Sequence, residues 1–301
     1  MSNLILEHKS TSEEIGPGSL WWKRLTLDPQ TSVYIDAARA GGIDTNEILF
    51  DVLRKPQHKQ AKGDTSPDAF RNRVLGAILE APEKYYQRGT IVRLEDEAIV
   101  AAGDLWQTAE QVRHAKNTNR WPRNPDSCTQ YFRTCDYWGA CAGEQSIDDP
   151  LLFELSEPHE ELSAEKRKLP LLTQSSTRSY RACPKRYYFR YVAGIRPRTA
   201  ATSLNVGRSL HKSLEVWWKR GGDLEAAIAA LGTDGDPWGL AKRQAMIAGY
   251  HARYLDDLPR WEVVAVEKEF IVDLINPDTG AKSRTFQIGG KVDVLVRKKA
   301  A

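Results

Sequence analysis

Leu4-Ile5-Leu6-Glu7-His8-Lys9-Ser10-Thr11 is an apolar run that ends in a carboxylate and an amine two residues apart. In a strand, residues two apart share a face, so Glu7 and Lys9 point into one site while His8 points away. This pattern is typical of a metal-dependent phosphodiesterase, in which the carboxylate holds Mg²⁺ or Mn²⁺ and the ammonium lies near the attacking water or the scissile phosphate. A solvated ion pair after a core strand is the alternative interpretation.

A second strand with a single acid lies at the other end of the 301 residues: Gly289-Gly290-Lys291-Val292-Asp293-Val294-Leu295-Val296. A buried aspartate in such a strand requires a partner charge or a metal ion. If residues 4–7 and 292–296 are neighbouring strands of one hairpin, Asp293 and Glu7 can share a metal ion.

The motifs of the chain resemble those of the PD-(D/E)xK nucleases, in the RecB-like branch that includes phage exonucleases and CRISPR-associated four-cysteine nucleases. That family runs from a Cys-Pro segment through a helical His, an Asp strand, a Glu-x-Lys strand and a Gln-x-x-x-Tyr helix to three cysteines. Here the same motifs occur in rotated order: Glu7-His8-Lys9, Gln30 with Tyr34, Cys128, Cys135, Cys141, Cys183-Pro184, His211 and Asp293. The chain is therefore similar to a circular permutant opened in the metal-site hairpin, over nearly its whole length.

The resemblance implies an α/β fold with a restriction-endonuclease-like mixed sheet flanked by helices, and a helical iron-sulfur region. Residues 1–155 would be the C-terminal half of the nuclease core and residues 173–301 the N-terminal half, together forming one structural domain. We expect residues 156–172 to be a junction linker, because residues 156–168 are charged and include almost no core residues.

The resemblance also implies the roles of the site residues. His211, Asp293 and Glu7 would bind Mg²⁺ or Mn²⁺, with the backbone carbonyl of His8 as a possible additional ligand, and Lys9 would position or activate water. His211 lies in a Gly-x-x-x-His-x-x-x-Glu pattern that matches the metal-binding helix of the family, although a lone helical His is more often a core or surface residue.

Two further groups of residues are candidates for substrate binding. Gln30 and Tyr34 share one helical face, which in the family approaches the DNA; a core tyrosine is the alternative. Arg181, Lys185 and Arg186 lie among tyrosines and a phenylalanine, a pattern suited to phosphate contact and base stacking. The aromatic residues of this second group would alternatively pack in the core.

The four cysteines follow the spacing Cys128-x6-Cys135-x5-Cys141, with Cys183 before a proline. The absence of a Cys-x-x-Cys pair disfavours a zinc ribbon. Four thiolates with a proline after one of them suit a [4Fe-4S] cluster, which in the family joins the beginning and end of the domain. Structural zinc and free thiols remain open alternatives.

Composition limits the function classes. The net charge of +3 is small, so affinity for DNA must come from local basic clusters. Neither a membrane span nor a signal peptide is visible, and a cytoplasmic location is expected.

We therefore expect a metal-dependent DNA exonuclease acting on single strands or duplex ends in recombination, repair or phage DNA processing, with a helicase or annealing protein as a candidate partner. A non-catalytic DNA-binding or assembly protein, and a rearranged product that assembles by exchange between chains, are the alternatives.

Local patterns predict the elements between these motifs. Strands are expected over 4–11, 47–53, 90–94, 261–274 and 285–296, and helices over 29–40, 67–87, 97–117, 175–191, 206–218, 224–231 and 237–258.

Overall fold

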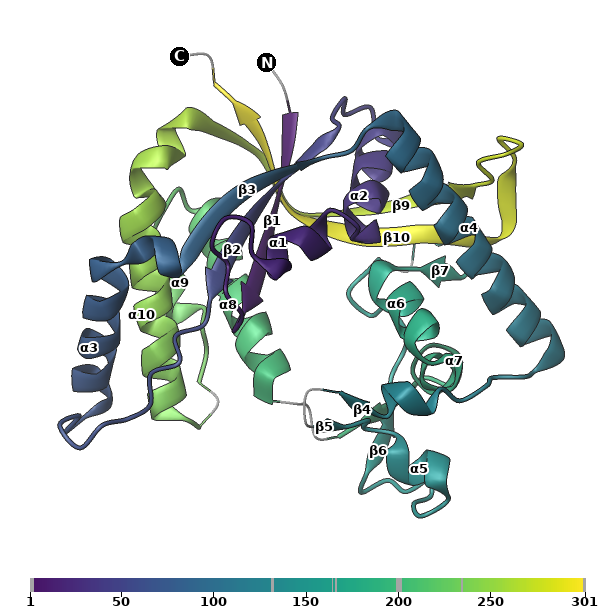
Figure 1. Ribbon diagram of the computed structural model, residues 1–301, viewed down its shortest axis with the longest axis horizontal. Helices are drawn as coiled ribbons and strands as arrows, with labels where there is room; N and C mark the ends of the chain where they lie inside the picture. Colours follow the sequence, from purple (N-terminus) through teal and green to yellow (C-terminus); the bar gives the residue numbers. More distant parts are fainter. Residues whose placement is uncertain are drawn as a thin grey trace. The chain divides into compact units, whose positions relative to one another are not determined.

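The computed structural model describes residues 3–130, 133–163, 165, 167–198, 202–233 and 235–299. The chain forms two compact units (Figure 1). Unit 1 comprises residues 1–93, 201–268 and 292–301, and unit 2 comprises residues 94–200 and 269–291. Within the described ranges, no helix has the length and apolar character needed to span a bilayer.

The sheet of unit 1 is mixed, as predicted. Its strands follow the order β3 (Tyr86–Val92), β2 (Glu47–Arg54), β1 (Asn3–Thr11) and the final part of β10 (Lys282–Lys298). β1 is parallel to β2 and antiparallel to β10. In Figure 1 the purple β1 and the yellow end of β10 run side by side, and Leu6 pairs with Val294. The expectation that the first and last strands are neighbours is confirmed.

One face of this sheet is covered by α3 (Pro67–Glu80), α8 (Thr202–Lys219) and α10 (Pro237–Tyr254). Leu4 and Leu6 of β1 pack there with Trp217 and Tyr250 in the main hydrophobic core. A Cβ atom at Gly249 would lie 2.5 Å from the side chain of Ile78. Glycine therefore allows α10 to approach α3 closely.

The remaining helices of unit 1 are short, except for α2 (Pro29–Ala40). This helix begins and ends where the sequence predicts, because Asp28 caps its first turn by accepting from the Gln30 amide and Pro29 is its first residue. It packs on β2. The shorter elements are α1 (Leu20–Leu25), the 3₁₀ turn Pro82–Lys84, α9 (Leu224–Ala229) and the 3₁₀ segment Leu255–Arg260.

Unit 2 is mainly helical and has small strand pairs. Its long helix α4 (Glu95–Thr118) packs on α6 (Gln174–Ala182). The strands expected over 261–274 and 285–296 are present as β9 (Trp261–Ile275) and β10, which pair, and residues 269–291 belong to this unit. The other elements are the 3₁₀ turn Pro125–Ser127, β4 (Thr129–Gln130), β5 (Arg133–Thr134), α5 (Trp138–Ala142), β6 (Phe153–Leu155), β7 (Leu171–Leu172), α7 (Pro184–Tyr187), the π-helical turn Tyr188–Val192 and β8 (Ile195–Pro197).

Two predicted helices are wrong in extent, in each case because of a proline. The helix expected over 67–87 ends at Glu80, ahead of Pro82, and the chain then enters β3. The helix expected over 175–191 breaks at Cys183, whose backbone is extended with φ −162°. The residue before a proline is disfavoured in the helical conformation, so Pro184 ends α6 at this point.

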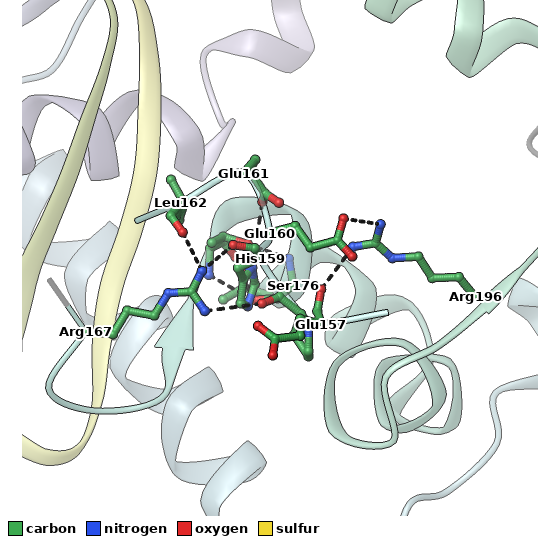
Figure 2. A network of polar contacts seen from close by, with 11 residues as sticks. Glu157, His159, Glu160, Glu161, Leu162, Arg167, Ser176 and Arg196 are labelled. Carbon is green, nitrogen blue, oxygen red and sulfur yellow. Dashed lines mark hydrogen bonds and ion pairs between the residues drawn. The ribbon is translucent and has the colours of Figure 1, made fainter. Parts of the chain in front are cut away.

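The segment 156–172 belongs to unit 2, and a network of polar contacts holds its charged part (Figure 2). Leu162 is 4% exposed. The Arg167 guanidinium donates to the carbonyl oxygens of Pro158, His159 and Leu162. These bonds satisfy main-chain acceptors that water would otherwise solvate. Residues 164 and 166 lie outside the described ranges, and the assignment of this segment as a junction between two halves stays a prediction.

Candidate functional site

Glu7 and Lys9 lie together on one face of β1, as the period of a strand predicts. The Lys9 ammonium Nζ donates to Glu7 Oε1 at 2.9 Å and to Gln30 Oε1 at 2.7 Å. The Gln30 amide donates in turn to Glu7 Oε1 at 2.7 Å. Gln30 lies in the first turn of α2, so this helix supplies the side chain that hydrogen-bonds both the Glu7 carboxylate and the Lys9 ammonium.

Asp293 reaches the same place from β10. Its Oδ2 accepts a hydrogen bond from the backbone N–H of His8 at 2.7 Å. Its Oδ1 lies 3.7 Å from Nδ1 of His211, which α8 contributes. The structure therefore brings together the four residues predicted for catalysis, Glu7, Lys9, His211 and Asp293.

The charges of these groups strongly influence one another. Burial and then the nearby charge of Asp293 raise the pKa of Glu7 above its ordinary value. For Asp293, burial acts in the same direction, but the hydrogen bond and charge of His211 outweigh it and lower the pKa. The carboxylates in turn raise the pKa of His211 and the pKa of Lys9, against the effect of burial on each. Glu7 and Asp293 therefore compete for the positive charges of Lys9 and His211.

The donor set suits a hard divalent cation. Oε2 of Glu7 is buried and accepts no hydrogen bond from the described residues, and a carboxylate oxygen of this kind is a preferred ligand of Mg²⁺ or Mn²⁺. Across the described ranges, no three His, Cys, Asp or Glu side chains converge closely enough to hold an ion as they stand. Glu7, Asp293 and His211 would hold the ion once Asp293 exchanges its contact with His211 for the metal.

Gln30 and Tyr34 occupy one face of α2, as expected, but both are buried, at 8% exposure each. Burial and the charge of Glu7 raise the pKa of Tyr34 well above its ordinary value, so its hydroxyl stays protonated. In this arrangement Gln30 contacts Glu7 and Lys9 directly. Its predicted contact with substrate, and that of Tyr34, stay predictions.

The three basic residues predicted to bind DNA lie in unit 2. Arg181 is held by α4, because it donates to Thr108 Oγ1 at 3.0 Å and to the carbonyl of Asp104 at 3.2 Å. The Lys185 ammonium lies 4.6 Å from the ring centroid of Tyr188. Arg186 contributes to the wall of a cavity that also contains the cysteines.

Cys128, Cys135, Cys141 and Cys183 line one small cavity of about 30 Å³ in unit 2. None of them forms a disulfide. The surrounding chain is held by hydrogen bonds such as that from the Cys135 amide to the carbonyl of Cys128, at 2.7 Å. The thiols do not form a ready metal-binding group among the described residues, so the predicted cluster stays a prediction.

Sequence reasoning missed a buried polar group on the opposite face of β1. Asp51 lies in the apolar run of β2 and is fully buried. Its Oδ2 accepts hydrogen bonds from the Tyr250 hydroxyl at 2.5 Å and from Arg88 Nη2 at 3.1 Å, and lies 3.5 Å from His8 Nδ1. A single acid within an apolar strand is the same pattern that identified Asp293.

Comparison with known proteins agrees with this geometry over part of the chain. The family model of the PD-(D/E)XK nuclease superfamily matches residues 171–301. This range contains Cys183, His211 and Asp293, whereas Glu7 and Lys9 lie outside it. No curated protein and no solved structure gives a significant match. The family match supports an α/β nuclease fold and suggests a metal-dependent nuclease, for which Mg²⁺ or Mn²⁺ is usual and DNA is the implied substrate.

Proposed function

We propose that this protein is a metal-dependent DNA exonuclease of the RecB-like type, with its site at the paired ends of β1 and β10. The observation that carries the proposal is the meeting of Glu7 and Lys9 with Asp293, from strands at opposite ends of the sequence. The superfamily match includes Asp293 but not Glu7 or Lys9. Glu7 and Lys9 lie beside Asp293 because β1 pairs with β10.

The residues have distinct roles in the proposed reaction. Glu7 and Asp293 hold the divalent cation, with His211 and the His8 carbonyl as further ligands. The ion supplies Lewis-acid stabilisation of charge on the phosphate when it is bound. The Lys9 ammonium, held by Glu7 and Gln30, orients the attacking water and stabilises negative charge that develops in the transition state.

The test is digestion of end-labelled linear DNA, single-stranded and duplex, with Mg²⁺, Mn²⁺ or EDTA. An exonuclease releases nucleotides from the ends of linear DNA and leaves closed circular DNA intact. Lys9→Ala should abolish cleavage, whereas Lys219→Ala, which changes an exposed lysine paired with Glu215, should not. A fully active Lys9→Ala protein defeats the assignment.

A non-catalytic DNA-binding or assembly protein is the second candidate. It is favoured by the finding that no three metal-binding side chains converge among the described residues. Such a protein would bind DNA equally well with and without Mg²⁺ or Mn²⁺ and would cleave none of the substrates above.

We also propose that the four cysteines hold a [4Fe-4S] cluster. Their common cavity and the short elements around it support this assignment. Anaerobic purification should give a protein with broad visible absorbance, together with iron and sulfide in equal amounts. Stoichiometric zinc without iron would instead identify a structural zinc site.

The rotated order of motifs supports a circular permutation of the family fold. Asn3 pairs with Arg297 at one end of the β1–β10 ladder, so a short loop could join the two strands as a hairpin. A chain whose backbone is closed by such a loop should remain monomeric and active. Loss of folding on closure would contradict a permuted arrangement, and an obligate dimer in light scattering would favour exchange between chains.

A further inference from the structure

Three polar residues lie side by side across the centre of the unit 1 sheet. His8 of β1 is in register with Asp51 of β2, and Asp51 is in register with Arg88 of β3. His8 and Asp51 are 2% and 0% exposed, and the Arg88 side chain is 13% exposed. Their side chains lie on the face of the sheet opposite Glu7 and Lys9. We call this group, with Tyr250, the polar ladder.

Hydrogen bonds join Asp51 to two other members of the polar ladder, Arg88 and Tyr250. Asp51 accepts from Tyr250 and Arg88 at 2.5 and 3.1 Å, and the Arg88 guanidinium lies 3.5 Å from the ring centroid of Tyr254. Burial alone would raise the pKa of Asp51, but Arg88 and His8 hold it well below its usual range. Asp51 is therefore a fixed negative charge, and its Oδ2 lies 3.5 Å from His8 Nδ1.

Stability is a poor explanation for this arrangement. A buried ion pair loses its hydration on folding, and well-packed apolar side chains of similar volume are often as stable or more so. The ladder does, however, fix geometry. The His8 ring is packed against Trp218 and Tyr250, with centroid distances of 6.4 and 6.3 Å, and its imidazole faces Asp51.

The position of His8 matters because its peptide unit is part of the proposed site formed by Glu7, Lys9, His211 and Asp293, which we call the catalytic edge. Its backbone N–H donates to Asp293 Oδ2 at 2.7 Å, and the residues on either side of it are Glu7 and Lys9. We propose that Asp51, supported by Arg88 and Tyr250, is a positioning residue that holds the His8 peptide, and through it Asp293, in the geometry that binds the metal ion. This inference rests on the proposed nuclease function.

The sharpest test is a matched pair of substitutions at His8. His8→Asn keeps a polar N–H group that can approach Asp51 as Nδ1 does, at 3.5 Å, whereas His8→Leu has the same branching at Cγ as Asn but no polar group. Loss of a group that orients a metal ligand typically costs about 10- to 100-fold in metal affinity or activity. We expect His8→Leu to lose this much in Mn²⁺ affinity of the DNA-free protein, measured by calorimetry, and in kcat, while KM for DNA is unchanged. His8→Asn should retain most of both.

A second substitution tests the other partner. Asp51→Asn keeps an acceptor for Tyr250 but removes the charge, and should weaken Mn²⁺ binding in the same way. Asp64→Asn is the matched control, since Asp64 is also buried and pairs with Arg73 at 2.7 Å but has no contact with the catalytic edge. It should leave Mn²⁺ affinity and kcat unchanged. Circular dichroism and thermal unfolding establish that each variant is folded.

The outcomes separate this inference from the proposed function. If the unchanged protein neither binds Mn²⁺ nor cleaves DNA, the proposed function fails. If it does both, and His8→Leu and Asp51→Asn match it in Mn²⁺ affinity and kcat, the nuclease assignment stands and the positioning role is overturned. Equal losses in His8→Asn and His8→Leu would also overturn it, because packing of the imidazole and not its contact with Asp51 would then be responsible.

Discussion

The catalytic edge of unit 1 and the cysteine cavity of unit 2 are built in different ways. At the edge, Glu7 and Asp293 come from adjacent strands of one sheet, so backbone pairing sets their separation. The cysteines come from short helices, turns and extended residues that line a small cavity. Burial raises the pKa of the Cys135 and Cys141 thiols, which therefore stay neutral until a metal displaces the protons. Strand pairing therefore fixes the separation of the two acids, whereas the arrangement of the cysteines depends on how several short elements pack together.

The largest effect should follow from breaking the cysteine site. Cys183→Ser removes one of the four thiols, and the protein should lose most of its bound iron and the cooperative unfolding of unit 2, because a metal centre of this kind contributes folding free energy directly. Iron analysis and calorimetry measure both. Mn²⁺ binding at the catalytic edge should persist, and its complete loss would contradict the independence of the two sites.

The next effect concerns the catalytic edge. Asp293→Asn should reduce the cleavage rate by about 10³-fold, since it removes a carboxylate that would hold the cation, and the cation would stabilise charge in the transition state. The measurement is the initial rate on end-labelled DNA with saturating Mn²⁺. Iron content and the unfolding of unit 2 serve as the internal control and should not change. A drop in iron would show that Asp293 acts through the fold.

A smaller effect is expected in the folded segment 156–172. Arg167→Ala leaves the carbonyl oxygens that it serves without a donor, and each buried acceptor left unpaired costs about 1–3 kcal/mol. Urea denaturation should show lower stability, with catalytic rate unchanged. Arg71→Ala, which removes a surface pair with Asp68, is the control and should cost less than about 1 kcal/mol.

The smallest effect is on the pH dependence of stability. The pKa of Glu161 in unit 2 is lowered and the pKa of Glu7 in unit 1 is raised, so ionisation of the two groups affects stability in opposite directions. The hydrogen bond from His159 lowers the pKa of Glu161 from 4.5 to about 2. This group therefore contributes stability above about pH 4.5 that is lost as pH falls towards 2. Because Glu161 is largely exposed, the contribution is small. Unfolding of wild type and Glu161→Gln across this window should show the difference shrinking as pH falls.

Glu7 should behave in the opposite way in the metal-free protein. Its pKa is raised above 4.5, so its ionised form opposes folding, and protonation relieves this as pH falls through the raised value. Glu7→Gln should therefore be at least as stable as wild type at neutral pH while being inactive. A clear loss of stability at pH 7 in Glu7→Gln would contradict the raised pKa.

Local sequence patterns were sufficient for much of the fold and for the core of the candidate site. Alternation in β1 placed Glu7 and Lys9 on one face, and the capping residues around α2 gave its limits. Pro82 and Pro184 explain why two of the predicted helices end early, at Glu80 and Ala182. The polar ladder was harder to predict, because the contacts of Asp51 with His8 and Tyr250 join segments far apart in the chain.

The pairing of β1 with β10 has a consequence for protein synthesis. β1 is translated well before β10 and lies inside the sheet, between β2 and β10, so one of its edges stays unpaired until β10 has been made. Until then its open edge can only be shielded by chaperones or by transient contacts. Asp293 emerges long after Glu7, so a nascent chain that still lacks β10 cannot bring the two acids together.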